Sequence, residues 1–278
     1  MTATIAQALA ASALDAGEAR VLMRHALGVD AAYLIAHGDE ALTSAHSTAF
    51  DALVARRAAG EPVAYITGVR EFFSLEFAVT PAVLIPRPET ELLVEWALEK
   101  ILPSAQARVL DLGTGSGSIA ISIAHERPRA QVAAVDCSDA ALALASANAR
   151  RHRLANVAFM SSDWFSALAG RRFDCIVANP PYIAAGDAHL ARGDLRFEPA
   201  AALASGSDGL DAIRLIVAAA PQYLSAGGWI AFEHGYDQAQ RCRRLLQDAG
   251  FTQVFSRADL AGIERVSGGR LDATEVKS

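Results

Sequence analysis

Residues 109–124 read VLDLGTGSGSIAISIA: a short aliphatic run, a turn with three glycines, and a second apolar run. The first run, Val109 to Leu112, predicts a buried strand, and the second, Ile119 to Ala124, predicts a helix. Glycine allows a sharp turn and lets backbone N–H groups approach a ligand at the start of a helix. The segment therefore predicts a nucleotide-like cofactor. The alternative is a tight strand-to-helix turn that binds nothing.

The spacing of the glycines narrows the choice of cofactor. They follow the pattern G-x-G-x-G, one residue shorter than the G-x-G-x-x-G turn that holds a dinucleotide pyrophosphate. This spacing favours S-adenosylmethionine over NAD and makes an oxidoreductase the weakest interpretation. Asp136 ends an apolar run nineteen residues after the last glycine, where its carboxylate can accept hydrogen bonds from both ribose hydroxyls. The cofactor-binding residues predicted from these two elements are Gly113, Thr114, Gly115, Ser116, Gly117 and Asp136.

Short strand-like runs alternate with helical stretches along the rest of the chain. These runs are 131–135, 157–160, 173–178 and 229–232, with two further candidates at 252–255 and 265–267. Strands that alternate with helices pair in parallel. The predicted fold class is therefore α/β, with a doubly wound, mostly parallel, Rossmann-like sheet. Residues 272–278 have little apolar content, and we expect them to be frayed.

The first 60 residues have apolar positions at helical spacing and predict a small helical bundle. Alternation and aromatic residues around Gly68 predict a β-hairpin over residues 63–79. Residues 1–80 are thus expected to form a helical substrate-docking domain with a hairpin linker, and residues 81–278 the cofactor-binding domain. Residues 1–80 carry five Arg and no Lys against nine Asp and Glu, which favours a protein-docking face over a nucleic-acid grip. A stability cap is the alternative role.

Acidic and aromatic residues follow the strand predicted at 157–160. In Ser162-Asp163-Trp164-Phe165, Asp163 can bind the exocyclic amine of an adenine, and Trp164 can cover its ring. Each residue singly has an ordinary structural alternative, a helix-capping Asp and a partly buried Trp. We nevertheless predict that both contact the cofactor.

Asn179-Pro180-Pro181-Tyr182 follows the strand predicted at 173–178 and so lies at the carboxyl edge of the sheet. An amide or aromatic-amine nitrogen is a poor nucleophile, so the site must hold it in line with the methyl donor and stabilise the developing charge. The Asn179 side-chain oxygen and the Pro180 carbonyl can each accept one N–H of an NH₂ group. Pro181 fixes the backbone, and Tyr182 can stack on a planar acceptor. Asn179, Pro180 and Tyr182 are the predicted catalytic residues, and the four residues together the predicted substrate-binding segment.

Composition and charge exclude several other classes. The chain has 278 residues, 52% of them hydrophobic, so most of it is not disordered. Its net charge of −6 argues against a protein whose main partner is nucleic acid. Its three cysteines are far apart and predict no zinc or disulfide framework, so we expect no metal and a reducing cytoplasm. No uninterrupted apolar span is long enough for a bilayer, so no membrane partner is expected. Cys137 and Cys175 are interpreted as small core residues, and Glu233 and His234 as makers of structural hydrogen bonds.

Taken together, the motifs resemble those of the protein-(glutamine-N5) methyltransferases that modify peptide chain release factors, the HemK family. The resemblance covers nearly the whole chain. It implies a class I methyltransferase sheet, S-adenosyl-L-methionine as cofactor, and as acceptor the glutamine of the Gly-Gly-Gln loop of release factors. It also implies that Asn179 contacts the cofactor as well as the glutamine, and that the helical N-terminal region docks the release factor. The matching motifs are 60–62, 67–72, 85–91, 113–117, 162–165, 179–183, 196–199 and 233–235.

Other functions remain open at this point. A flipped adenine offers the same NH₂ geometry, so an adenine-N6 nucleic-acid methyltransferase is one rival, although the acidic N-terminal region disfavours it. Methylation of a glutamine in a large-subunit ribosomal protein is a second, because sister enzymes share these motifs. A non-catalytic module that binds release factor or ribosome is a third. Arg87 and Glu89, in the Pro-rich 85–91 connection, either cover the cofactor or form an interdomain salt bridge.

Overall fold

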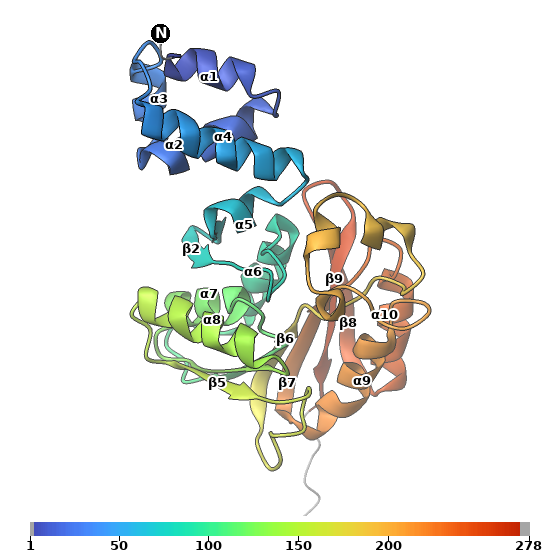
Figure 1. Ribbon diagram of the computed structural model, residues 1–278. Helices are drawn as coiled ribbons and strands as arrows, with labels where there is room; N and C mark the ends of the chain where they lie inside the picture. The colour runs from blue at the N-terminus through green and yellow to red at the C-terminus, as the bar shows by residue number, and fades with distance from the viewer. Residues whose placement is uncertain (1–2, 273–278) are drawn as a thin grey trace, which may run out of the picture. The chain divides into compact units, whose positions relative to one another are not determined.

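The computed structural model describes residues 3–272 and divides into two compact units (Figure 1). One unit contains the chain up to Val69 together with Arg192–Phe197. The other contains Arg70–Ala191 and the chain from Glu198 onward. The frayed end expected at 272–278 lies, apart from Asp272, outside the described residues.

The first unit is the predicted helical bundle. Its helices are α1 (Ile5–Ala11), α2 (Ala16–Leu27), α3 (Ala31–Ala36), α4 (Ser44–Ala58) and α5 (Val63–Thr67), with the short 3-10 helix η3 (Gly193–Phe197). The first four helices each begin after a Thr or Asp whose side chain accepts a backbone N–H of the first turn, which satisfies donors that would otherwise lack partners. Leu22, Met23 and Phe50 lie at the centre of its core.

The hairpin is shorter than the sequence predicts, because residues 63–67 are helical. Val63, Tyr65 and Ile66 favour strands by type, but Pro62 precedes the first turn and Gly68, at φ 74°, ends the helix in the left-handed conformation. The hairpin consists of β1 (Val69–Phe72) and β2 (Leu75–Ala78). Its turn lies at Phe73 and Ser74, both at positive φ, which is the backbone that a two-residue hairpin turn requires.

The second unit contains the predicted α/β sheet. Seven strands lie in the order β5-β4-β3-β6-β7-β9-β8. The neighbours from β5 to β7 pair in parallel, whereas β9 is antiparallel to both β7 and β8. All seven predicted strands form: β3, β4, β5 and β6 agree with the prediction to within one residue, whereas β7, β8 and β9 are at least four residues longer than predicted. Their bounds are β3 (Arg108–Leu112), β4 (Gln131–Asp136), β5 (Val157–Ser161), β6 (Phe173–Ala178), β7 (Leu224–Glu233), β8 (Phe251–Ala258) and β9 (Glu264–Leu271).

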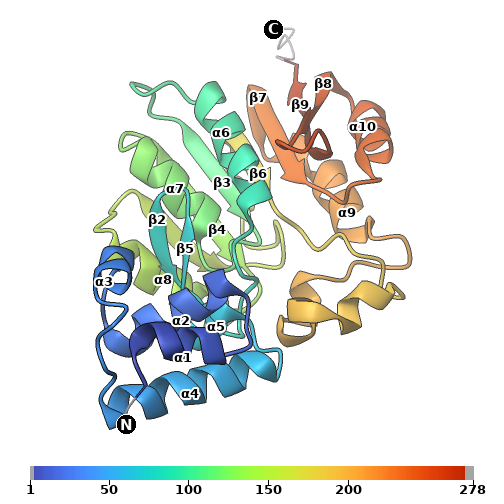
Figure 2. The same cartoon turned by 90° about the horizontal axis from the view of Figure 1, so that it is seen from above.

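Helices cover both faces of this sheet (Figure 2). Successive residues of a strand point to opposite faces. Val109 accordingly belongs to the core cluster that contains residues of α6, α7 and α8, and Leu110 to the cluster that contains residues of α9 and α10. The α-helices of this unit are α6 (Glu91–Lys100), α7 (Ser118–Glu126), α8 (Asp139–Arg151), α9 (Asp211–Ala219) and α10 (Ala239–Asp248). Short 3-10 helices are η1 (Pro88–Thr90), η2 (Ala188–Ala191), η4 (Ala200–Ala202) and η5 (Ala220–Gln222).

Candidate active site

The register of the sheet brings the predicted site segments together. Leu112, at the end of β3, pairs with Val135 on one side and with Ala178 on the other. The glycine loop, Asp136 and Asn179 therefore follow paired positions at one edge of the sheet. The chain leaves β3 toward β4 on one side and continues through β6 on the other, so this is the switch point at which doubly wound sheets bind ligands.

The glycine loop turns tightly at the start of α7. Gly113, Gly115 and Gly117 all have positive φ, a conformation that side chains with a Cβ rarely adopt. At Gly117 space is also lacking, because a Cβ would lie 2.8 Å from Ile121 Cδ1 and 3.1 Å from Ala145 Cβ. The backbone conformation therefore favours glycine at all three positions, and the close packing around Gly117 excludes a side chain there as well.

The Asp136 carboxylate holds the loop in place. Its Oδ2 accepts a hydrogen bond from the Gly115 N–H at 2.9 Å, and its Oδ1 accepts one from the Ser138 N–H at 2.9 Å. A carboxylate has about four lone-pair directions. Two remain for a ligand, the number that the two ribose hydroxyls of a nucleoside need.

A second carboxyl group, that of Asp111, lies buried beneath the same loop. Its Oδ2 accepts from the Thr114 hydroxyl at 2.7 Å, and its Oδ1 has no hydrogen-bond partner among the described residues. Burial raises the pKa of Asp111 from 3.8 to about 7, while the bond from Thr114 opposes the rise. Asp111 belongs to the 109–124 segment, but the sequence alone does not indicate a role for it.

Residues 162–164 border the site from the end of β5. Trp164 has a left-handed backbone, at φ 47°, and its ring lies about 3.6 Å from the position of a Cβ on Gly113. Asp163 is exposed, and both residues line the pocket. Cys137 lines it too and is exposed, which corrects its interpretation as a core residue; Cys175 is buried, as expected.

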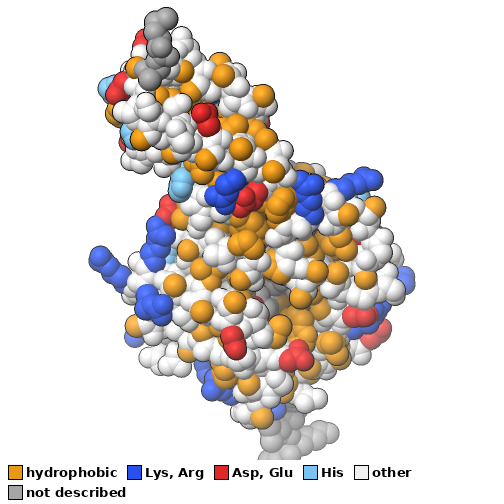
Figure 3. Space-filling model, viewed as in Figure 1, with side chains coloured by type: hydrophobic (Ala, Val, Ile, Leu, Met, Phe, Trp, Pro, Cys, Tyr) orange, Lys and Arg blue, Asp and Glu red, His pale blue; other side chains and the backbone are white. Residues whose placement is uncertain are grey.

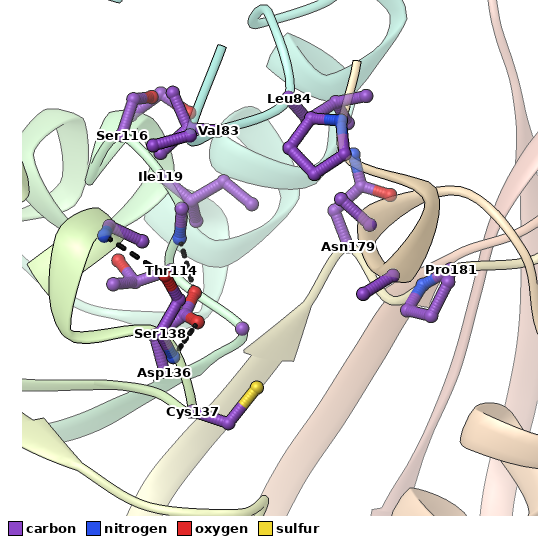
Figure 4. A pocket seen from close by; sticks show the side chains of 18 of the residues that line it. Val83, Leu84, Thr114, Ser116, Ile119, Asp136, Cys137, Ser138, Asn179 and Pro181 are labelled. Atoms are coloured by element: carbon purple, nitrogen blue, oxygen red, sulfur yellow. Dashed lines mark hydrogen bonds between the residues drawn. The ribbon is translucent and has the colours of Figure 1, made fainter. Parts of the chain in front are cut away.

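These segments enclose a cavity of about 290 Å³ (Figure 4). Asn179 and Pro181 lie across it from Asp136, Cys137 and Ser138. Most predicted site residues line it: Gly113, Thr114, Gly115, Ser116, Asp136, Asp163, Trp164, Asn179 and Pro181. Gly117, Pro180 and Tyr182 are not among the described residues that line the cavity. Further residues contribute to the wall as well: Ala82, Val83, Leu84, Pro86, Arg87, Thr90, Pro199, Ala201 and Ala202.

Asn179 presents an unpaired acceptor in this cavity. Its Nδ2 donates to the Thr90 hydroxyl at 3.1 Å. Its Oδ1 is buried and has no hydrogen-bond partner among the described residues. Buried oxygens are normally satisfied, and one left open in a ligand cavity suits a donor that the ligand brings.

Thr90 and Tyr182 both bond to a buried glutamate. The Thr90 hydroxyl donates to Glu233 Oε2 at 2.5 Å, and the Tyr182 hydroxyl donates to Glu233 Oε1 at 2.9 Å. Burial raises the pKa of Glu233, and these two bonds oppose that rise. Glu233 and His234 are hydrogen-bonded, as expected, the latter to the Ser267 hydroxyl at 2.8 Å. The link from Glu233 through Thr90 to Asn179 was not predicted.

A further ion pair organises the wall of the cavity. Arg87 bonds to the buried carboxylate of Glu198, which also accepts from the Ile85 N–H at 3.3 Å. Both residues belong to the second unit, so the salt bridge of Arg87 lies within that unit and not between domains. It connects the 85–91 and 196–199 motifs, whose partnership the sequence did not indicate.

Family models and curated relatives match this chain over most of its length. The family model "PrmC N-terminal domain" matches residues 2–68, and "Methyltransferase small domain" matches residues 88–208. The release factor glutamine methyltransferase of Burkholderia pseudomallei is 58% identical over 275 residues, covering 97% of this chain and 96% of its own. That of Bordetella pertussis is 54% identical, covering 91% and 94%. The chain belongs to the release factor glutamine methyltransferase family.

Solved structures agree with the fold of this release factor glutamine methyltransferase family member. A methyltransferase from Pyrococcus furiosus superposes with a TM-score of 0.55 at 16% identity, covering 78% of this chain and 97% of its own. A T. Thermophilus 16S rRNA methyltransferase in complex with AdoMet and guanosine gives 0.54 at 23% identity, covering 73% and 49%. Within residues 3–272, no helix is long and apolar enough to cross a membrane. Nor does that part of the chain bring three His, Cys, Asp or Glu side chains together as a metal site.

Proposed function

We propose that this methyltransferase acts on the side-chain amide nitrogen of the glutamine in the Gly-Gly-Gln loop of peptide chain release factors. The name shared by its relatives supports the choice of substrate. The single structural observation that carries the chemistry is Asn179 Oδ1, a buried acceptor without a partner in the cavity at the switch point.

The residues of the cavity fit S-adenosyl-L-methionine. When bound, this cofactor supplies a methyl group on a sulfonium. Asp136 would hold the ribose hydroxyls, and Asp163 and Trp164 would hold the adenine. The glycine loop offers backbone N–H groups and room for close approach. We assign cofactor binding to residues 113–117, Asp136, Asp163, Trp164 and Asn179.

Asn179 and Pro180 would orient the acceptor. A carboxamide nitrogen has a delocalised lone pair and becomes nucleophilic only as charge develops on it, so acceptors for its two protons stabilise the transition state. Asn179 Oδ1 and the Pro180 carbonyl would each accept a hydrogen bond from one N–H of the carboxamide, and Pro181 and Tyr182 would complete the substrate-binding segment. A carboxylate has no proton for either acceptor, so such a site would reject glutamate. The surplus proton leaves to water after transfer, without a dedicated general base.

The sequence predicts docking of the release factor by residues 1–80 and catalysis by residues 81–278. Because the units divide after Val69 and Arg192–Phe197 belongs to the first, we assign docking to the first unit and catalysis to the second. The excess of acidic residues in the first segment suits a protein partner better than a phosphate backbone. On the face shown in Figure 3, acidic side chains occur among basic and hydrophobic ones, whereas a nucleic-acid groove would be basic throughout. No membrane or specific nucleic-acid partner is proposed.

The test is methyl transfer with mapped products. The purified protein is incubated with labelled S-adenosylmethionine and, separately, a release factor, large-subunit ribosomal proteins, and DNA or RNA. Peptide mass spectrometry then locates the added mass. Modification confined to the Gln of the Gly-Gly-Gln loop supports the proposal. Transfer to a ribosomal protein or to nucleic acid alone overturns it.

A further inference from the structure

The orientation of the Asn179 side-chain amide decides whether it can bind the carboxamide that receives the methyl group. An asparagine carries a hydrogen-bond acceptor on one branch of its amide and two donors on the other. Only the oxygen can accept a hydrogen bond from a carboxamide NH₂. If the amide were reversed, two NH₂ groups would face each other, and the site would favour a ligand rich in acceptors instead.

Thr90 fixes that direction. Its hydroxyl has a single proton, and this proton is directed at Glu233 Oε2, 2.5 Å away. Toward Asn179 the Thr90 oxygen can therefore only accept, and it accepts from Nδ2 at 3.1 Å. The Nδ2 branch is thus occupied, and Oδ1 is the branch left over. Thr90 is 2% exposed, so water does not compete effectively for these bonds.

Glu233 is the group that gives the chain of hydrogen bonds its direction. Both of its oxygens accept, one from Thr90 and the other from the Tyr182 hydroxyl, and the residue is 2% exposed. A protonated Glu233 needs an acceptor for its own proton, and both nearest oxygens already point their protons toward it. If the Thr90 hydroxyl turns to accept the proton of Glu233, its own proton can point toward Asn179. The Asn179 amide then reverses so that its oxygen accepts this proton in a hydrogen bond.

We propose, on the basis of the function assigned above, that Glu233 is a positioning residue: through Thr90 it holds Asn179 with its oxygen toward the acceptor amide. Tyr182 contributes by anchoring the second carboxylate oxygen. This gives the buried glutamate at the end of β7 a role in substrate discrimination, although it does not line the cavity.

The arrangement predicts a dependence on pH. The charged and titratable groups that act on Glu233 are Glu89, Arg265 and Tyr182, and Arg87 acts on Tyr182. His234, next in the chain, bonds instead to Ser267. Because burial raises the pKa of Glu233, it gains a proton at a higher pH than an ordinary glutamate. The productive orientation is therefore lost on the acid side.

The first experiment compares T90V with T90S in methyl transfer to an intact release factor. T90V keeps the shape of the side chain but removes the hydroxyl, and we expect kcat to fall by about 10- to 100-fold. T90S keeps the hydroxyl and should recover most of that loss. A release factor with glutamate in place of the methyl-accepting glutamine serves as inhibitor. The Kd of this glutamate form divided by the Kd of the glutamine form measures discrimination, and this ratio should fall at least about 10-fold in T90V. Equal weakening of both ligands, or no recovery in T90S, overturns the proposal.

The second experiment follows pH. The kcat of the unsubstituted enzyme should fall as the pH is lowered. The glutamine side chain that E233Q introduces gains no proton in this range, so this variant should be slower overall, but its kcat should not fall further at low pH. An unchanged acid limb in E233Q contradicts the proposal.

A third measurement does not depend on the acceptor. In ¹⁵N-labelled protein, the Asn179 amide signal is identified by its disappearance in N179D. Its proton exchange should be slow in the unsubstituted protein and in T90S, and at least about 10-fold faster in T90V. Unchanged exchange overturns the positioning role. Slow exchange that depends on the Thr90 hydroxyl, in a protein that methylates no release factor, supports the positioning and overturns only the proposed function.

Discussion

The Gly115 N–H donates to the Asp136 carboxylate across 2.9 Å, which ties the loop after β3 to the end of β4. One side chain thus shapes the glycine loop and also retains lone pairs for a ligand. The carboxylate is partly exposed in the cavity, so removal of its charge should affect binding more than folding.

For D136N we expect the Kd for S-adenosylmethionine to rise by about 10- to 100-fold, because one amide branch can no longer accept. Isothermal titration calorimetry measures the effect. D139N is the matched control, since Asp139 is exposed three residues further on and does not line the cavity. Equal Kd values for the two variants would show that Asp136 does not hold the ligand.

N179A should lower kcat by roughly two to three powers of ten, the cost of removing one preorganised polar group from a developing charge. The Kd for S-adenosylmethionine should change less, because Oδ1 serves the methyl-accepting amide and Asn179 is only one of the residues assigned to the cofactor. Single-turnover kinetics with a release factor, alongside cofactor titration, separates the two effects. Near-unchanged turnover would remove Asn179 from the mechanism.

G117A should destabilise the protein more than G250A does. Both glycines have φ of 84°, so both substitutions incur backbone strain of about 1–2 kcal/mol. Nothing lies within 4 Å of a Cβ at Gly250, whereas a Cβ at Gly117 meets Ile121 and Ala145. Overpacking adds about 1–3 kcal/mol at Gly117 alone. Urea unfolding of the two variants tests this, and equal losses would contradict it.

Asp111 should make the protein less stable as pH rises. Its pKa is raised from 3.8 to about 7 in the folded state, so between these values the folded protein holds a proton that the unfolded chain has lost. The free energy of unfolding therefore falls as pH increases from about 4 to about 7. Above the folded pKa, the full destabilisation from the ionised, buried Asp111 carboxylate is present. D111N removes this contribution. Urea titrations at several pH values should give D111N a stability advantage that grows with pH, and a constant difference would refute the argument.

Much of the fold could be predicted because its signals are local. Residues 109–112 and 173–178 are short, mostly apolar runs, each with a single Asp, that favour buried strands, and the glycine loop marks the first turn. The error at 63–67 has a local cause too: residues that favour strands were captured by a helix start at Pro62 and a helix end at Gly68. The residues at the two ends of this segment, and not the strand preference of the residues between them, therefore decided its structure.

The site was predictable where a motif follows a strand, and not where partners are distant. Asp136 ends β4 and Asn179 directly follows β6, so the topology predicts that they lie near each other. Thr90 and Glu233 are 143 residues apart, and no spacing rule connects them. Only the three-dimensional structure shows that the 85–91 connection and the end of β7 meet beneath Asn179.

The assignment of Arg192–Phe197 to the first unit has a practical consequence for dissecting the molecule. The polypeptide passes between units after Val69, returns for six residues, and leaves again after Phe197. Within the first unit, Arg57 Nη1 contacts Asp194 Oδ1 at 2.9 Å, and Arg196 Nη2 donates to the Ala59 carbonyl at 2.9 Å. A truncated fragment that starts at residue 70 would carry this hexapeptide without the surface it packs on. Dissection therefore requires excising or redesigning an internal stretch as well as cutting once near the amino terminus.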